Sequence, residues 1–407
     1  MSYQSKTPWS FVKPTTCTTP EKLFALETPY TGKRINKAKL VRKLTEKDKK
    51  VSRALSAMGD PIPESWSWRK LGENDPKYKG KIEPARDQGG CGSCWAFSLS
   101  AALSDRYVIK YGIEPQYLSP TWLMSKTYDL MEVRPAESCN EGGDPHMASK
   151  WLETNGTKEE KCWPYSLIKQ HSWVSPNELP SECCATCCDP EIATSSQILY
   201  SVQPESTRTL AVISGNTIDK EATVTAIQRE IMSNGPVVCG FQVFDDFSTY
   251  WAKYAPNGDI YVTNARGDSG GHAVTLTGWG VGEINGEKVR YWEMRNSWGN
   301  SGDNGYGRIA FSTDVPRNSI LQVDVPAELD TDRSGNVLFS GGTFAFTPGA
   351  KPNLENYAIR ENFEHSSDDK CSTKFMGLNM HISIIILIII AVIMVIGIIS
   401  VLIIKKR

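Results

Sequence analysis

The chain has 407 residues, of which 40% are hydrophobic and 22% are charged. This composition is typical of a globular protein and excludes a chain that is disordered throughout. The formal net charge is -1, so the chain as a whole gives no reason to expect a nucleic acid as its partner. It contains 11 cysteines, an odd number, so at least one thiol stays unpaired within the chain.

A basic stretch with good helix formers occupies residues 33–53, and Gly59, Asp60 and Pro61 then interrupt it. Its charge is typical of a solvated helix, and a patch for nucleic acid or an anionic membrane is the less favoured interpretation. Residues 1–60 are therefore predicted to form a separable leading segment.

The folded body is predicted over residues 61–326, where helix and strand signals alternate without a low-complexity break. Within it, the run QGGCGSCWAFS contains glycines that cannot sustain a helix, followed by a strong helix former from Cys94 that ends before Gly112. Cys94 is thus predicted at a helix N-terminus. Unpaired backbone N–H groups there are expected to lower the pKa of the thiol and favour the attacking thiolate.

A histidine and an asparagine fall on two successive predicted strands. His272 follows two glycines and opens the first strand, and the second strand carries Asn296. Residues 285–286, Asn-Gly, are a strong hairpin signal between them. The hairpin is predicted to bring the side chains together, so that the Asn296 amide oxygen accepts one ring N–H and turns the other nitrogen toward Cys94.

These motifs resemble the papain-like family of cysteine proteases, because Cys-Gly-Ser-Cys-Trp is the local signature of the papain and cathepsin nucleophile. The resemblance extends over residues 61–326. It implies an α+β, papain-like two-lobed fold, with a helical left lobe and an antiparallel, β-barrel-like right lobe. It also implies a thiol endopeptidase whose substrate is a polypeptide and which uses neither a cofactor nor a metal.

The resemblance further implies a role for each residue of the site. Cys94 is the nucleophile, His272 acts as acid and base, and Asn296 orients His272. Gln88 donates a side-chain N–H to the oxyanion hole, beside the backbone N–H of Cys94. Trp298 covers the contact between the histidine and the asparagine from water.

Two further features follow from the resemblance. The loop around Cys139 resembles the family's Cys-Asn-Gly-Gly loop with Glu141 inserted. It implies that Gly142 and Gly143 offer backbone groups to an extended substrate, as in strand addition. It also implies a disulfide between Cys91 and Cys139.

The spacing between Cys94 and His272, 272 − 94 = 178 residues, exceeds the common 130 to 150 and indicates an insertion. Residues 161–216 are the candidate, and they resemble the cysteine-rich insertion of cathepsin B. Cathepsin B uses paired histidines there to bind a substrate C-terminus, whereas this stretch offers only His171, which favours endopeptidase activity. Disulfide bonds and a zinc site remain alternatives for its cysteines. These are Cys162, Cys183, Cys184, Cys187 and Cys188.

The C-terminal part is predicted to tether the body to a membrane. Residues 327–380 are rich in Asp, Ser, Gly, Asn and Pro and are interpreted as a stalk. From Ile382 to Ile404 the chain is uncharged and long enough to cross a bilayer as one helix, and residues 405–407 form a basic tail. The protein is thus predicted to be a single-pass membrane protein, with its orientation and oligomeric state left open.

Competing functions differ in what they ask of the motifs. A catalytically inactive, membrane-tethered binding module on the same fold is the alternative to an active hydrolase, and the presence of Cys94, His272, Asn296 and Gln88 favours the hydrolase. The leading segment is interpreted as a prosegment that lies along the active-site cleft until it is cut near residues 59–61. The alternative is a basic targeting arm.

Overall fold

The structure is a computed structural model. It describes residues 42–127, 142–165, 199–215, 217–263, 269–314, 327–331, 337–340, 342–352, 374–375 and 378–379. The chain divides into two compact units, of which the first comprises residues 1–179 and 199–352. In the second unit, strands β14 (Lys374–Phe375) and β15 (Leu378–Asn379) form an antiparallel pair.

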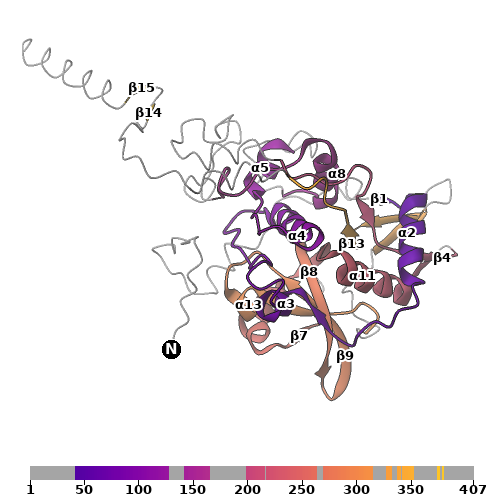
Figure 1. Cartoon of the computed structure of the whole chain (residues 1–407). Helices are drawn as coiled ribbons and strands as arrows, with labels where there is room; N and C mark the ends of the chain where they lie inside the picture. Colours follow the sequence, from indigo (N-terminus) through magenta and orange to yellow (C-terminus); the bar gives the residue numbers. More distant parts are fainter. Residues whose placement is uncertain are drawn as a thin grey trace, which may run out of the picture. The chain divides into compact units, whose positions relative to one another are not determined.

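Helix α4 (Cys94–Tyr111) is the central helix of the first unit (Figure 1). It begins and ends as predicted, and Gly112 closes it with a φ of 63°, a left-handed conformation that favours glycine. Helices α5 (Pro120–Lys126) and α8 (Pro145–Asn155) pack against it. Both begin with proline in the first turn, after the side-chain caps Ser119 and Asp144.

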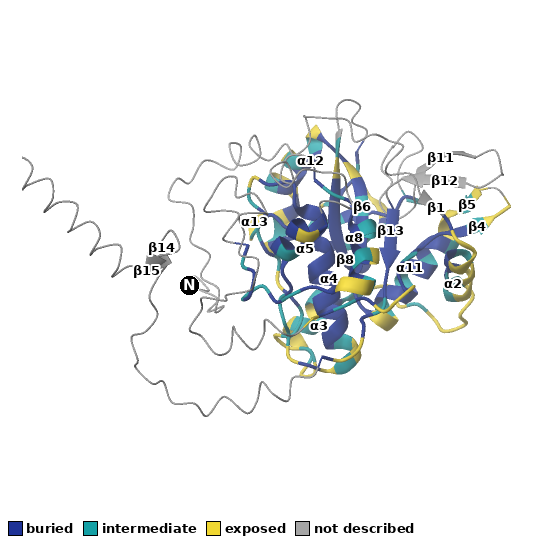
Figure 2. Cartoon of the chain, turned by 90° about the horizontal axis from the view of Figure 1, so that it is seen from above, coloured by how far each residue is buried: buried dark blue, intermediate teal, exposed yellow. Residues whose placement is uncertain are grey.

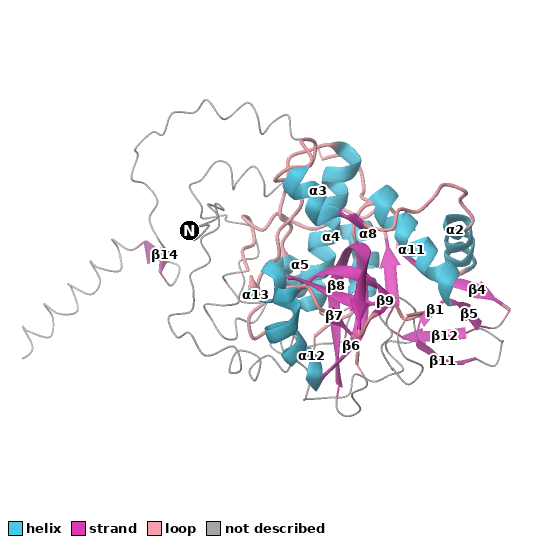
Figure 3. Ribbon diagram, turned by 90° about the horizontal axis from the view of Figure 1, so that it is seen from below, coloured by secondary structure: helices cyan, strands magenta, loops and turns pink. Residues whose placement is uncertain are grey.

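An eight-stranded sheet forms the other part of the unit, and Figure 3 separates its strands from the helices. Its order is β3 (Arg208–Thr209), β13 (Gly342–Ala345), β6 (Val237–Phe244), β8 (Ser269–Ile284), β9 (Glu287–Arg295), β10 (Tyr306–Ala310) and β7 (Ile260–Tyr261), with β2 (Trp66–Ser67) paired to β8. The α+β class is confirmed. All described pairs in this sheet are antiparallel except β7 with β10, which is parallel.

The remaining elements are short, apart from two longer helices that pack against each other, α2 and α11. They are β1 (Arg42–Lys43), α2 (Glu46–Ser56), α3 (Trp68–Asn74), β4 (Val212–Ser214), β5 (Thr217–Asp219), α11 (Lys220–Asn234), α12 (Asp245–Thr249), the π-helix η3 (Tyr250–Tyr254), the 3₁₀-helix η4 (Ala255–Asn257), α13 (Ser301–Asn304), β11 (Ala327–Thr331) and β12 (Val337–Ser340). In the described part of the chain, no helix combines the length and apolar character needed to cross a membrane; residues 382–404 lie outside that part.

The hairpin that carries His272 and Asn296 forms as predicted. Strands β8 and β9 pair antiparallel down to Ile284 and Glu287, and residues 285–286 make the turn. Asn285 and Gly286 both have positive φ, 52° and 84°, as a tight hairpin turn requires.

The predicted stalk begins too early. Strand β13 lies inside the main sheet, where Phe344 pairs with Val238 of β6 and Thr209 of β3. Thr343, Phe344 and Phe346 are all buried. Residues 342–352 thus belong to the folded body. Composition concealed this strand because it is only four residues long and lies between segments rich in glycine and polar residues.

Helix α2, which falls within the predicted leading segment, packs on the body. Its inner face is buried and its outer face is exposed (Figure 2). Thr209 N–H, on edge strand β3, donates to the Asp48 carboxylate at 3.1 Å, and Ala211 N–H donates to the Ser52 hydroxyl at 3.2 Å. None of the hydrogen bonds described for α2 reaches Cys94 or His272. Residues 1–41 lie outside the described part.

Replacing Asp48 with alanine should destabilise the body by about 1–3 kcal/mol. The change removes the cap that Asp48 and Thr45 share at the start of α2 and leaves the Thr209 N–H without its acceptor. Urea unfolding of the purified protein measures the effect, with the exposed Lys50→Ala as the control on the same helix. Equal stability of the two variants would show that α2 contributes little to the body.

Candidate active site

Cys94 is the first residue of α4 and is buried, with 7% of its surface exposed. Ser93, the residue before it, makes no side-chain capping bond to the helix, and its hydroxyl instead bonds the Tyr165 hydroxyl at 2.7 Å. The thiol accepts hydrogen bonds from the backbone N–H groups of Trp95 and Ala273. The second donor places the sulfur beside strand β8, next to His272.

Burial raises the pKa of the Cys94 thiol to about 11, although the backbone N–H groups of Ala273 and Trp95 act in the opposite direction. The sequence had predicted a lowered pKa from the helix N-terminus. The backbone N–H donors are present, but the free energy lost by removing water from an isolated thiolate exceeds the stabilisation that these donors provide. The thiol therefore rests protonated until a second group in the site takes its proton.

The side chains of His272 and Asn296 are in contact. The His272 Nε2 lies 2.8 Å from Asn296 Oδ1, and both residues are buried. Asn296 Oδ1 also accepts the Ser297 N–H at 2.8 Å, which fixes the oxygen as an acceptor. Nε2 must then carry a proton, so the lone pair of a neutral ring is on Nδ1, which has no hydrogen-bond partner in the described structure. Nδ1 is thereby available as the base.

Burial lowers the pKa of His272 to about 4, against the opposing effect of its bond to Asn296. The imidazole is thus neutral at pH 7 and can accept a proton. Neither Cys94 nor His272 ionises readily alone, whereas a thiolate and an imidazolium formed together would attract each other. The arrangement suits a thiolate and imidazolium that form together.

Aromatic rings enclose the histidine. The Trp298 ring lies 5.1 Å from the His272 ring, and Phe241 and Phe247 lie 5.8 and 6.3 Å away. Trp298 is itself 93% buried, since 7% of its surface is exposed. The structure therefore brings Trp298 to its predicted place beside the histidine, where an apolar ring limits access of water to the bond with Asn296.

Gln88 is held close to Cys94 by a set of short hydrogen bonds. Its Nε2 donates to the Cys91 carbonyl at 2.7 Å, and its Oε1 accepts the Ser297 hydroxyl at 2.5 Å. Its backbone carbonyl accepts the Tyr165 hydroxyl at 2.7 Å. A side-chain amide carries two N–H donors, so the one not bonded to Cys91 can serve an oxyanion.

The sequence prediction assigned no role to Ser93, Tyr165 or Ser297. Tyr165 and Ser297 bond Gln88, and Tyr165 also bonds Ser93, the residue before Cys94. Tyr165 ends the run Cys-Trp-Pro-Tyr at residues 162–165, at the start of the predicted insertion. A signal was available, because a tyrosine buried in a body usually finds a partner for its hydroxyl. The sequence could not indicate which partner, since Tyr165 and Gln88 are 77 residues apart.

The predicted substrate-binding glycines lie directly before α8. Gly142 is buried with a φ of 67°, and Gly143 is partly exposed. Gly143 precedes the cap residue Asp144. Their contact with a substrate stays a prediction.

The cysteines outside the site are described only in part. Cys91 and Cys162 each take part in a disulfide bond. The predicted partner of Cys91, Cys139, lies outside the described residues, as do the other cysteines of the proposed insertion: Cys183, Cys184, Cys187 and Cys188. Within the described ranges no group of three or more metal-ligating side chains occurs. Residues 199–215, placed in the insertion by the sequence, instead contribute strands β3 and β4 to the body.

Comparison with known proteins decides the family. Residues 62–322 match the sequence profile of the papain family cysteine proteases, which is well over half of the chain. The chain belongs to this family. Among papain-family relatives, Cathepsin B-like cysteine proteinase 5 of Caenorhabditis elegans is 31% identical over 296 residues, which cover 68% of this chain and 79% of that protein.

Two other relatives are matched over less of their length. Probable cysteine proteinase 024R of Invertebrate iridescent virus 3 is 30% identical over 332 residues, or 72% of this chain and 64% of that protein. Cathepsin B-like cysteine proteinase 6 of Caenorhabditis elegans is 32% identical over 270 residues, or 62% of this chain and 63% of that protein. The papain-family chain thus spans less than two thirds of these two relatives.

The depressed pKa of His272 predicts a specific loss of stability in acid. Below pH 6.5 the unfolded chain binds a proton at this histidine while the buried ring stays neutral until about pH 4, so stability is present above this window and lost as the pH falls through it. In a Cys94→Ala background, the His272→Gln variant should lack this pH-dependent contribution to the free energy of unfolding. Urea unfolding of the two proteins should therefore differ in pH dependence by about 3 kcal/mol across the window. Parallel curves would contradict a buried neutral His272.

Proposed function

We propose that the protein is a thiol endopeptidase that hydrolyses polypeptides through an acyl-enzyme on Cys94, with His272 as acid and base and Asn296 as the orienting residue. The observation that carries the proposal is the 2.8 Å bond from His272 Nε2 to Asn296 Oδ1, which leaves Nδ1 for the thiol. Membership of a family of cysteine proteases supports the same reaction.

In the first half of the reaction, His272 Nδ1 takes the thiol proton while Cys94 Sγ forms a bond to the carbonyl carbon of the substrate. The carbonyl oxygen becomes an oxyanion, for which the second Gln88 side-chain N–H and the Cys94 backbone N–H are the proposed donors. His272 then returns its proton to the leaving nitrogen as the C–N bond breaks. A thioester on Cys94 and a free amine result.

In the second half, water replaces the amine. His272 Nδ1 removes a proton from the water as its oxygen bonds to the thioester carbon, and collapse of the second oxyanion breaks the C–S bond. The proton on His272 returns to Cys94 sulfur. Asn296 keeps Nε2 protonated throughout, so the ring cannot turn its lone pair away from the site.

Endopeptidase activity is proposed rather than removal of C-terminal dipeptides. The segment that resembles the cathepsin B insertion has one histidine, His171, in place of the paired histidines of cathepsin B. His171 lies outside the described residues. The alternative, an inactive binding module on the same fold, would give a protein that binds peptides without turnover. No observation in the described site favours it.

Cys94→Ala should abolish hydrolysis of a fluorogenic peptide while leaving the fold intact, because the site offers no other nucleophile in this position. Asn296→Ala should lose less, roughly 10- to 1000-fold in kcat, because Asn296 orients the base without transferring protons. The measurement is kcat and KM for each purified variant, with circular dichroism as the control for folding. Unchanged turnover by Cys94→Ala would rule out the mechanism, and total loss in Asn296→Ala would contradict the role given to it.

The prosegment function is proposed for the leading segment, residues 1–60, with cleavage near residues 59–61. Helix α2 packs on α11 and on the strand edge, with buried bonds to Thr209 and Ala211. Arg229 of α11 also bonds the carbonyls of Met58 and Asp60, close to the predicted cut.

Membrane attachment is proposed for Ile382 to Ile404, on the grounds of its length and the absence of charge. A protein that ends at Pro352 keeps the complete first unit and lacks the apolar stretch. We expect this truncation to be soluble without detergent and to have the kcat/KM of the full chain. Flotation with lipid vesicles measures attachment, with the full chain as the matched control. A full chain that does not float would disprove the anchor.

A further inference from the structure

A buried ion pair joins the two elements that carry the candidate nucleophile and its orienting residue. Arg295, the last residue of β9, directly precedes Asn296, and its guanidinium donates to Asp105 at 2.8 Å. Asp105 is fully buried on α4, 105 − 94 = 11 residues after Cys94. Eleven residues are about three helical turns, so both side chains lie on the same face of the helix. The pair thus fixes β9 to the face of α4 that carries the thiol.

A second buried pair extends this contact to the segment that leads to Gln88. Glu83 and Arg86 form an ion pair of 2.6 Å. The backbone N–H of Glu83 donates to Asp105 at 2.8 Å, and its carbonyl accepts from Arg295. We call these four residues the buried quartet. It pairs two acidic with two basic side chains, and its members come from the segment before Gln88, from α4 and from the end of β9, next to Asn296.

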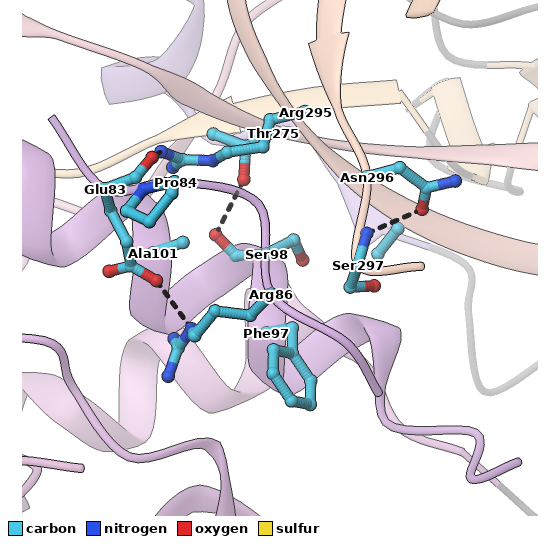
Figure 4. A pocket seen from close by; sticks show the side chains of 11 residues that line it. Glu83, Pro84, Arg86, Phe97, Ser98, Ala101, Thr275, Arg295, Asn296 and Ser297 are labelled. Carbon is cyan, nitrogen blue, oxygen red and sulfur yellow. Dashed lines mark hydrogen bonds and ion pairs between the residues drawn. The ribbon is translucent and has the colours of Figure 1, made fainter. Parts of the chain in front are cut away.

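Figure 4 shows three members of the quartet, Glu83, Arg86 and Arg295, in one view with Asn296. Glu83, Arg86 and Arg295 line one cavity together with Asn296 and Ser297. Its volume is about 10 Å³, enough for roughly one water molecule. The cavity leaves room for a shift of Arg295 to displace the neighbouring Asn296. Close packing around the two residues would resist such a displacement.

Other ionisable groups face the quartet. Glu160 lies 3.5 Å from Arg86, and Tyr117 and Tyr306 lie near enough to interact with its charges. Burial raises the pKa of Glu160 to about 7. Any pH-dependent measurement on the quartet must therefore be compared with a variant that leaves these three residues in place.

We propose that the buried quartet is a positioning device for the reaction, in which Arg295 is the positioning residue that keeps Asn296, and through it His272, aligned with Cys94 on α4. This inference rests on the proposed function of Cys94 and His272. It predicts that neutralising the pair changes how readily the thiol gives up its proton, beyond any effect on folding.

The test compares two isosteric variants on matched ion pairs. Asp105→Asn neutralises the partner of Arg295. Glu230→Gln neutralises a buried carboxylate on α11, a helix that carries no site residue. Glu230 pairs with Arg106 of α4 at 2.9 Å and also with Arg208 at 2.7 Å. The probe is iodoacetamide, whose reaction with Cys94 is followed by peptide mapping from pH 4 to pH 9. Steady-state kcat and KM are measured alongside.

We expect Asp105→Asn to slow alkylation of Cys94 near pH 6 by about 10-fold or more and to lower kcat similarly, with KM within about 2-fold. Glu230→Gln should leave alkylation and kcat within about 2-fold, even if it unfolds at a lower temperature. Equal effects of the two variants would reduce the quartet to a structural role and overturn the inference.

A double variant guards against misfolding. Asp105→Leu with Arg295→Met removes both charges, so no unpaired charge stays buried and the fold should survive. If Cys94 in this folded variant is alkylated more slowly than in the wild type, the result supports positioning. Alkylation of the variant at the wild-type rate refutes it. The pH dependence of Cys94 alkylation in the wild type separates the two proposals. If it matches that of an ordinary thiol and the protein hydrolyses no peptide, both the proposed function and this inference are overturned. A reactive wild-type thiol with unchanged variants overturns this inference alone.

Discussion

The packing of helix α4 against strand β8 is the constraint on which the candidate site depends. The Ala273 N–H of β8 donates to the Cys94 thiol, and one turn further along α4 the Thr275 hydroxyl donates to the Ser98 carbonyl at 3.2 Å. Most of α4 is buried, which is typical of a helix enclosed on all sides rather than one with a solvent face. Because the sulfur and the imidazole come from opposite sides of this interface, their alignment is a property of the packing of the body and not of one loop.

Burial at this interface has a cost that the site itself offsets. It raises the pKa of Cys94 and lowers that of His272, so each residue alone favours its neutral form. The energy of an isolated charge is high in such surroundings, but the attraction between a thiolate and an imidazolium is also stronger there than in water. The same low polarity strengthens the bond between His272 and Asn296, over which Trp298 packs. Water exclusion therefore penalises separate ionisation and favours proton transfer within the pair.

Local signals allowed the sequence to predict the parts of the site whose geometry depends on neighbouring residues. The end of α4 at Gly112 and the turn at residues 285–286 follow from backbone conformations that few residues adopt. The predictions failed where pairing is non-local. Strand β13 is four residues long, and its partners β6 and β3 lie about 100 or more residues earlier in the chain, so no periodicity reveals it. The raised pKa of Cys94 was missed for the same reason, because burial arises from distant segments.

The folded body extends beyond the residues that match the family profile. The match covers residues 62–322, yet strand β13 of the main sheet and helix α2, which packs beside that sheet, lie on either side of that range. Strand β13 separates β3 from β6, so β3 has no place in the sheet without it. Helix α2 then covers the outer edge of β3, where Asp48 and Ser52 accept backbone N–H groups that a strand partner would otherwise bind. The two flanks are also joined directly, since β1 pairs with β12. Protection of this edge therefore depends on α2 and β13, one on each side of the range that the family profile covers.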